Sequence, residues 1–219
     1  MSRDPAALDP VALCGLLASR LCHDLINPVG ALGSGLEVLD DPDMDHAMKE
    51  AALDLIRSGG EKSITLLKYA RLAYGAGGGR GAELPMEEAE AMLRELFKWT
   101  KATLDWRLAP GHVSKEKVKT VLILTHAAAD SIPRGGTVAV TGGGDYFRIE
   151  AQGPKTYLPE DLTAALAGAC ADLKPKFAPA YIAGLLARES GGEISAVLDG
   201  DRVIMRAKFG AGDGFEPPR

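Results

Sequence analysis

The sequence has no long apolar run, no excess of positive charge and few cysteines. Its 219 residues carry a net charge of -5, whereas proteins that bind nucleic acid or anionic membranes generally need a basic surface. The longest apolar runs fall short of the roughly 20 residues that cross a bilayer. We therefore expect neither nucleic acid nor a membrane among the partners of this chain.

Cysteine usage and the N-terminal segment point to the compartment. Cys14, Cys22 and Cys170 form no CxxC motif and lack the Cys/His spacing that is typical of zinc sites. The first residues contain no cationic stretch that leads into a long apolar segment, as a secretory signal would. We expect a cytoplasmic protein that binds no metal and no cofactor of its own.

The first third of the chain predicts two long helices. Asp9-Pro10 is a typical helix start, and leucines return to one side of the helix up to Asp40. A second helical pattern runs from about Asp43 to Tyr74, before the glycine-rich stretch 75–84. Because a lone hairpin leaves apolar faces uncovered, we expect two hairpins to form a dimeric four-helix bundle. The first predicted domain is therefore a helical hairpin over residues 8–75.

The remaining chain, residues 83–210, mixes both element types. Its patterns predict helices and strands in the ranges 86–100 (helix), 103–108 (strand), 115–131 (helix), 137–141 and 146–151 (a hairpin), 179–190 (helix), 193–198 and 202–209 (strands). Helices on one face of a mostly antiparallel sheet form a sandwich. The predicted fold class is therefore α+β: a helical hairpin followed by an α/β sandwich.

The segment LCHDLINP, residues 21–28, holds the candidate chemistry. On a helical wheel His23 lies about 160–180° from the leucine stripe, so it faces outward. Asp24 is placed to hydrogen-bond one imidazole nitrogen and leave the other as a nucleophile. Pro28 interrupts the helix one turn later. A lone surface histidine would be read as solvated, but these neighbours favour a reactive one.

These residues resemble a known family. LCHDLINP is similar to the phosphoacceptor box of two-component histidine kinases, which runs His, acidic residue, two spacers, Asn or Thr, and Pro. The segments RLCHDLINPVGALGSGLEVLDDP, LLKYARLAYGA and ATLDWRL resemble the ChpT-type histidine phosphotransferases of alphaproteobacteria. The likeness extends over nearly the whole chain, from Leu8 to Phe209.

The resemblance implies a phosphorelay protein. Its members are homodimers that take a phosphoryl group from the receiver domain of a hybrid histidine kinase and pass it to response-regulator receiver domains, where Mg²⁺ is bound. Carried over, His23 is the phosphoacceptor, Asp24 its acid/base and orienting partner, and Asn27 a polar neighbour. Arg20, one turn before His23, either meets phosphate or the partner's acidic pocket, or is a solvated surface arginine.

The resemblance also implies a C-terminal domain shaped like a kinase ATP-binding domain, but its nucleotide groups are missing. The magnesium-binding Asn of kinases corresponds to Ala127, and the adenine-binding Asp to Ala151. Lys174-Pro175-Lys176 replaces a glycine-rich phosphate loop. We therefore expect a phosphotransferase that does not bind ATP. Two alternatives stay open: a receiver-binding module without chemistry, and, less favoured, an ATP-dependent histidine kinase.

Overall fold

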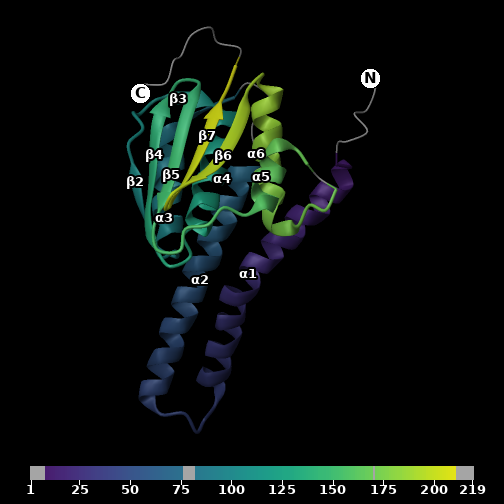
Figure 1. Ribbon diagram of the computed structural model, residues 1–219. Coiled ribbons are helices and arrows are strands. Elements are labelled where there is room, and N and C mark those ends of the chain that lie inside the picture. The colour runs from purple at the N-terminus through teal and green to yellow at the C-terminus, as the bar shows by residue number, and fades with distance from the viewer. Residues whose placement is uncertain (1–7, 76–81, 170, 211–219) are drawn as a thin grey trace.

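The computed structural model describes residues 8–75, 82–169 and 171–210. A long helical hairpin projects from an α/β sandwich that packs on one end of it (Figure 1). Most of the predicted glycine-rich linker, residues 76–81, lies outside the described residues. The predicted α+β architecture is confirmed, whereas the dimeric bundle stays a prediction.

The hairpin consists of α1 (Pro10–Asp40) and α2 (His46–Tyr74). Asp9 caps α1, where its carboxylate accepts hydrogen bonds from the N–H groups of residues 11 and 12. Asp45 caps α2 in the same way by accepting from the N–H of Met48. Both caps satisfy backbone donors that have no partner inside the helix. The sequence placed the start of α2 three residues too early because Asp43 and Asp45 offer similar caps.

The two helices of the hairpin pack closely through small residues. A Cβ atom on Gly59 would lie 2.6 Å from the carbonyl oxygen of Pro28, and one on Gly35 would lie 2.6 Å from Cγ1 of Ile56. Pro28 is buried at this contact. Figure 1 shows α1 changing direction partway along its length. A proline inside a helix removes one hydrogen bond and accounts for such a bend.

The sandwich is built on a five-stranded sheet. In the order β2-β4-β5-β7-β6, β2 pairs parallel with β4 and the other neighbours are antiparallel. The sequence predicts a mostly antiparallel sheet, but neither the strand order nor the parallel pair. These strands are β2 (Ala102–Trp106), β4 (Gly136–Gly143), β5 (Tyr146–Gln152), β6 (Glu193–Asp199) and β7 (Arg202–Lys208). A second, two-stranded sheet pairs β1 (Glu83–Pro85) with β3 (His112–Ser114).

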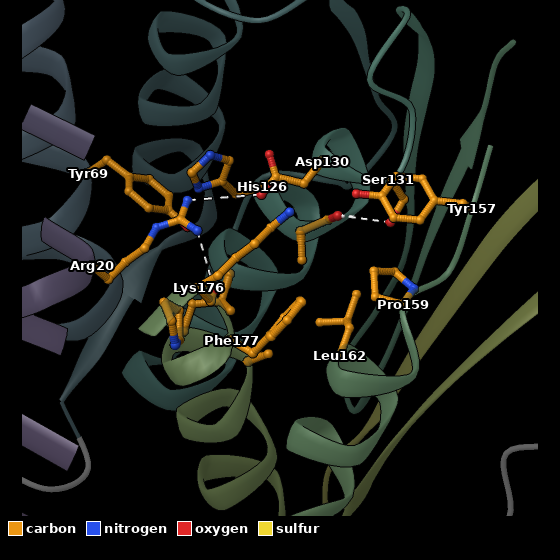
Figure 2. Close-up of a pocket in the computed structure, with 14 residues that line it drawn as sticks. Arg20, Tyr69, His126, Asp130, Ser131, Tyr157, Pro159, Leu162, Lys176 and Phe177 are labelled. Atoms are coloured by element: carbon orange, nitrogen blue, oxygen red, sulfur yellow. Dashed lines mark hydrogen bonds and ion pairs between the residues drawn. The ribbon is translucent and has the colours of Figure 1, made fainter. Parts of the chain in front are cut away.

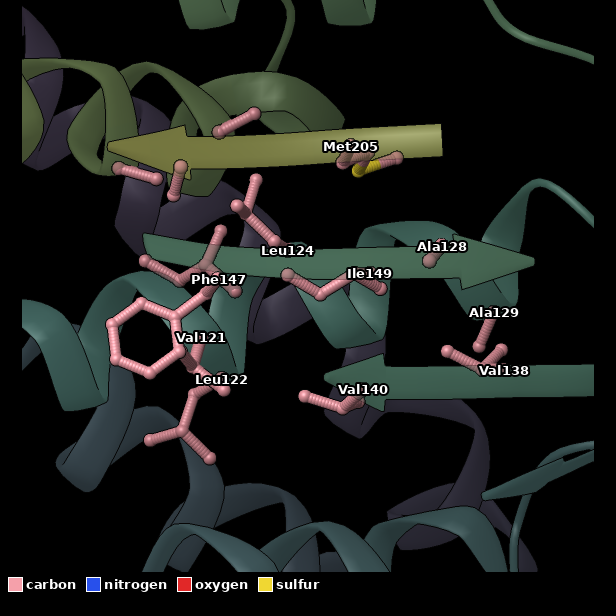
Figure 3. Close-up of a cluster of buried hydrophobic side chains, with 14 of the residues drawn as sticks. Val121, Leu122, Leu124, Ala128, Ala129, Val138, Val140, Phe147, Ile149 and Met205 are labelled. Atoms are coloured by element: carbon pink, nitrogen blue, oxygen red, sulfur yellow. The ribbon is translucent and has the colours of Figure 1, made fainter. Parts of the chain in front are cut away.

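Helices α4, α5 and α6 pack against the larger sheet. The helices of this part are α3 (Met86–Phe97), α4 (Lys115–Asp130), α5 (Glu160–Ala167) and α6 (Ala178–Glu189), with the 3₁₀ turn η1 (Pro175–Phe177) before α6. Val121, Leu122 and Leu124 of α4 meet strand residues such as Phe147 and Ile149 in the core (Figure 3). The sequence had not predicted α5, β1 or β3.

The C-terminal end of α2 belongs to the core of the sandwich. Tyr69 and Ala73 are buried in the same hydrophobic cluster as the residues of α4. The Tyr69 hydroxyl also donates a hydrogen bond to the carbonyl of Leu122, at 3.3 Å. The hairpin and the sandwich therefore share one core at this end, which fixes where residues of α1 lie relative to α4 and η1.

Candidate functional site

His23 lies near the middle of α1 and projects into solvent. Its side chain is 80% exposed, and its Nδ1 atom lies 3.3 Å from Oδ1 of Asp24. If Nδ1 carries the proton, it donates to this carboxylate and leaves Nε2 with a free lone pair. The structure thus brings together the two residues that the sequence singled out for chemistry.

Asp24 is much less accessible than its neighbour, because its side chain is only 17% exposed. Its second oxygen, Oδ2, accepts a hydrogen bond from Nε of Arg20 at 2.6 Å. The spacing of four residues places both side chains on one face of α1. The carboxylate therefore contacts the imidazole with one oxygen and the guanidinium with the other.

Arg20 points toward the sandwich. Its Nη1 atom donates to the carbonyl of Lys176 at 3.3 Å, and Nη2 lies 4.0 Å from Oδ2 of Asp130 (Figure 2). The side chain is 13% exposed. The sequence treated Arg20 as an outward-facing group beside His23, since a helical wheel gives no sign of a domain that covers this side of α1. The solvated reading of Arg20 is wrong.

Asn27 is exposed and lies one turn after His23 on α1. Both residues line a cleft of about 480 Å³ between the hairpin and the sandwich. The cleft also contains Lys62 of α2 and Lys101 and Lys176 of the sandwich. With Arg20, these lysines outnumber the two carboxylates of the cleft, Asp24 and Asp130, so the lining is net positive and favours an anionic partner or group. Sequence reasoning did not name Lys62 or Lys101 and treated Lys176 only as part of a lost phosphate loop, because no local pattern links residues that meet only after folding.

Ala127 and Ala151 are the two positions where the sequence predicts lost nucleotide-binding groups. Ala127, predicted at the lost metal position, lines a cavity of only about 30 Å³ together with Phe177 and Tyr157 (Figure 2). Sites for drug-sized ligands usually measure about 300–1,000 Å³, so this cavity has room for little more than water. Ala151 is completely buried in β5. Neither alanine offers an oxygen atom.

His126 borders both this cavity and the cleft. Its ring stands edge-on to Tyr69, with ring centroids 4.9 Å apart. Burial lowers the pKa of His126, while Asp130 acts in the opposite direction and Arg20 adds to the lowering. These surroundings are those of a histidine packed at the contact between the hairpin and the sandwich.

In the described ranges of the chain, no group of three or more His, Cys, Asp or Glu side chains is placed to hold a metal ion. In the same ranges, no helix has the length and apolar character needed to cross a bilayer.

Known proteins resemble the chain in sequence and in structure. Residues 86–202 match the family model described as the histidine phosphotransferase C-terminal domain. The protein phosphotransferase ChpT of Brucella abortus (strain 2308) is 32% identical over 210 residues, which cover 93% of this chain and 99% of that protein. The solved structure of a bacterial phosphotransferase superposes with a TM-score of 0.81 at 30% identity, and covers 93% of this chain and 99% of that one.

Proposed function

The chain belongs to the histidine phosphotransferase family, and we propose that His23 is the residue on which it carries the phosphoryl group. The protein is therefore a phosphotransferase of a phosphorelay. One observation supports His23 above all: an 80% exposed imidazole contacts a carboxylate that is only 17% exposed. Such a pair holds one ring nitrogen while leaving the other open to a partner protein.

The proposed reaction uses the two imidazole nitrogens differently. The lone pair on Nε2 attacks the phosphorus of an aspartyl phosphate in the donor. The phosphorus–oxygen bond breaks, and its electron pair stays on the donor carboxylate. A carboxylate of the acceptor later attacks the phosphohistidine, and the electron pair of the phosphorus–nitrogen bond returns to Nε2. Throughout, Asp24 accepts the Nδ1 hydrogen bond and stabilises the positive charge that develops on the ring.

The proposed donor is the receiver domain of a hybrid histidine kinase, and the acceptors are response-regulator receiver domains. Receiver aspartates and their phosphoryl groups are anionic, which suits the cleft that Lys62, Lys101 and Lys176 line beside His23. Asn27 is placed to contact the incoming group from the same helix. Mg²⁺ would be supplied in the receiver, where it neutralises charge on the transferring phosphoryl group.

We also propose a homodimer formed by residues 8–75. Among the described residues, the hairpin leaves several large apolar side chains exposed, including Val11, Ile26, Val29, Leu36, Ile64 and Leu67. A row of exposed apolar residues on a hairpin marks a protein interface. A second hairpin would cover the row and complete a four-helix bundle.

The two alternative functions are less well supported. A module without chemistry has no need of the contact between His23 and Asp24. An ATP-dependent kinase needs groups at Ala127 and Ala151 that alanine does not provide, and it needs room beyond a cavity of about 30 Å³. In the proposed function, the protein therefore transfers a phosphoryl group between proteins without using a nucleotide.

The test is phosphotransfer from a phosphorylated receiver domain to the purified protein. We expect His23→Ala to abolish the formation of acid-labile, base-stable phosphoprotein while the fold remains, because the residue is exposed. His46→Ala is the matched control, since His46 is 88% exposed and its Nδ1 atom lies 3.6 Å from a carboxylate oxygen of Glu50. Phosphate uptake by His23→Ala would overturn the proposal.

Asp24→Asn separates chemistry from binding in the same assay. The amide keeps the shape of the side chain but loses its charge, so receiver binding should persist while transfer slows by roughly 10²–10⁴-fold. An unchanged rate would reduce Asp24 to a neighbour without a role in the reaction.

A further inference from the structure

We propose that Arg20 is a positioning residue for phosphotransfer, through which the C-terminal sandwich controls the orientation of His23. Arg20 donates a hydrogen bond to the Asp24 carboxylate, and that carboxylate contacts Nδ1 of His23. Lys176 and Asp130 of the sandwich in turn contact the Arg20 guanidinium. This inference rests on the proposed role of His23. It assigns Arg20 a role other than contact with phosphate.

The first step is the division of the Asp24 carboxylate between two partners. Oδ2 accepts from Nε of Arg20 at 2.6 Å, and Oδ1 lies 3.3 Å from Nδ1 of His23. A free carboxylate on a helix can rotate and present either oxygen to water. The charge-assisted bond to Arg20 fixes one oxygen, so the other stays beside the imidazole. At 17% exposure, water competes poorly for that position.

The second step is the contact between Arg20 and two residues of the sandwich. The Lys176 carbonyl, in η1, accepts from Nη1 at 3.3 Å, and the Asp130 carboxylate, at the end of α4, lies 4.0 Å from Nη2. Three nitrogens of one planar group thus meet three oxygens from three elements. A guanidinium offers five N–H donors in fixed directions, whereas a lysine ammonium is a single point charge. The geometry therefore requires arginine.

The third step connects this network to reactivity. When Nδ1 donates to Asp24, the ring is held in the tautomer whose Nε2 lone pair faces solvent. Without Arg20, the carboxylate is free to turn toward water, and the ring samples both tautomers and more orientations. A misplacement of about 1 Å in a reacting group can cost roughly a hundredfold in rate. Arg20 should therefore affect the transfer step more than receiver binding.

The experiment compares full-length Arg20→Gln and Arg20→Lys with wild type, with Arg94→Gln as the matched control. Arg94 makes a similar bond across four residues, to Glu90 on α3, outside the cleft. We expect Arg20→Gln to lower the transfer rate constant about ten- to a hundredfold with receiver affinity within about twofold. Arg20→Lys should recover part of the rate. Nitrogen-15 NMR of His23 should show one tautomer in wild type and a mixture in Arg20→Gln.

Two further measurements make the outcome decisive. Arg20→Gln combined with Asp24→Asn should be no slower than Asp24→Asn alone, because the two residues act as one unit. If Arg20→Gln fails to fold, Asp130→Asn tests the same connection from the sandwich. Asp130 is 43% exposed, and its loss should shift the tautomer and the rate in the same direction to a smaller extent.

Clear results would overturn the inference. A wild-type rate and tautomer in Arg20→Gln would show that Asp24 needs no positioning. A loss of receiver affinity without a change in rate would make Arg20 a contact for the partner. If wild-type His23 accepts no phosphate, the proposed function fails. The tautomer comparison would then still decide whether Arg20 positions the pair.

Discussion

At the scale of single residues, His126 is a buried titratable group that borders the cleft of the proposed phosphotransfer site. Burial keeps its pKa below the ordinary value of about 6.5, despite the opposing charges of Asp130 and Asp24. An unfolded chain binds a proton at this histidine more readily than the folded chain does. The contribution of His126 to stability is therefore present above about pH 6.5 and is lost as pH falls through the depressed folded-state pKa.

His126→Gln should weaken this acid sensitivity. We expect the free energy of unfolding of wild type, measured with urea between pH 8 and pH 5, to fall more steeply below about pH 6.5 than that of the variant. His46→Gln is the control, because that histidine is 88% exposed. Equal pH slopes in wild type and His126→Gln would show that His126 titrates alike in both states.

The sequence indicates the residues of the proposed site more readily than the residues that contact them from the sandwich. His23, Asp24 and Asn27 lie within one helical turn, so a local motif reveals them. Asp130 and Lys176 come from α4 and η1, and they reach α1 only because α2 shares its core with the sandwich. No spacing along the sequence indicates that Asp130 and Lys176 contact Arg20.

At the scale of elements, Gly59 lies at a close contact between α1 and α2. Gly59 and Gly60 are neighbours, but a Cβ atom on Gly59 would lie 2.6 Å from the carbonyl oxygen of Pro28, whereas one on Gly60 would lie 3.9 Å from Cδ2 of Leu32. Backbone cannot yield as a flexible side chain can. The same substitution should therefore have opposite effects at the two positions.

We expect Gly59→Ala to destabilise the protein by about 1–2 kcal/mol, because overlap costs about 1–3 kcal/mol and exceeds the gain in helix propensity. Gly60→Ala should stabilise it by up to about 1 kcal/mol. Thermal and urea unfolding of the two variants measure the difference. Stabilisation by both substitutions would mean that the helices move apart at little cost.

The predicted elements follow the strength of their local patterns. The long helices and the β4–β5 hairpin carry clear periodicity and glycine turns, and the sequence placed them well. The strands β1 and β3 have three residues each, at Glu83–Pro85 and His112–Ser114, and pair across a helix and β2. Such short strands form only through tertiary contacts, and three residues are too few for a periodic pattern that would predict them.

At the scale of the whole molecule, the exposed apolar side of the hairpin predicts assembly. Light scattering should give twice the 23.0 kDa mass of one chain at micromolar concentration. Leu36→Glu should shift the mass toward one chain, because a charge in an apolar interface is costly. Leu198→Glu is matched in exposure, at 50% against 51%, but lies on β6 of the sandwich and should leave the mass unchanged. A single-chain mass for wild type would contradict the dimer.

If the protein uses no nucleotide, as we propose, the sandwich must have another role. Ala127 and Ala151 leave no oxygen for a metal or an adenine, and the cavity that Ala127 lines holds about 30 Å³. Calorimetry with Mg²⁺ and ATP should therefore show no saturable heat at millimolar nucleotide, under conditions where a histidine-kinase ATP-binding domain gives a clear signal. Saturable ATP binding would instead support the alternative that the protein is an ATP-dependent histidine kinase. If ATP does not bind, we expect the sandwich to act through its contact with α1. There its residues line the cleft beside His23, and the Lys176 carbonyl accepts a hydrogen bond from Arg20.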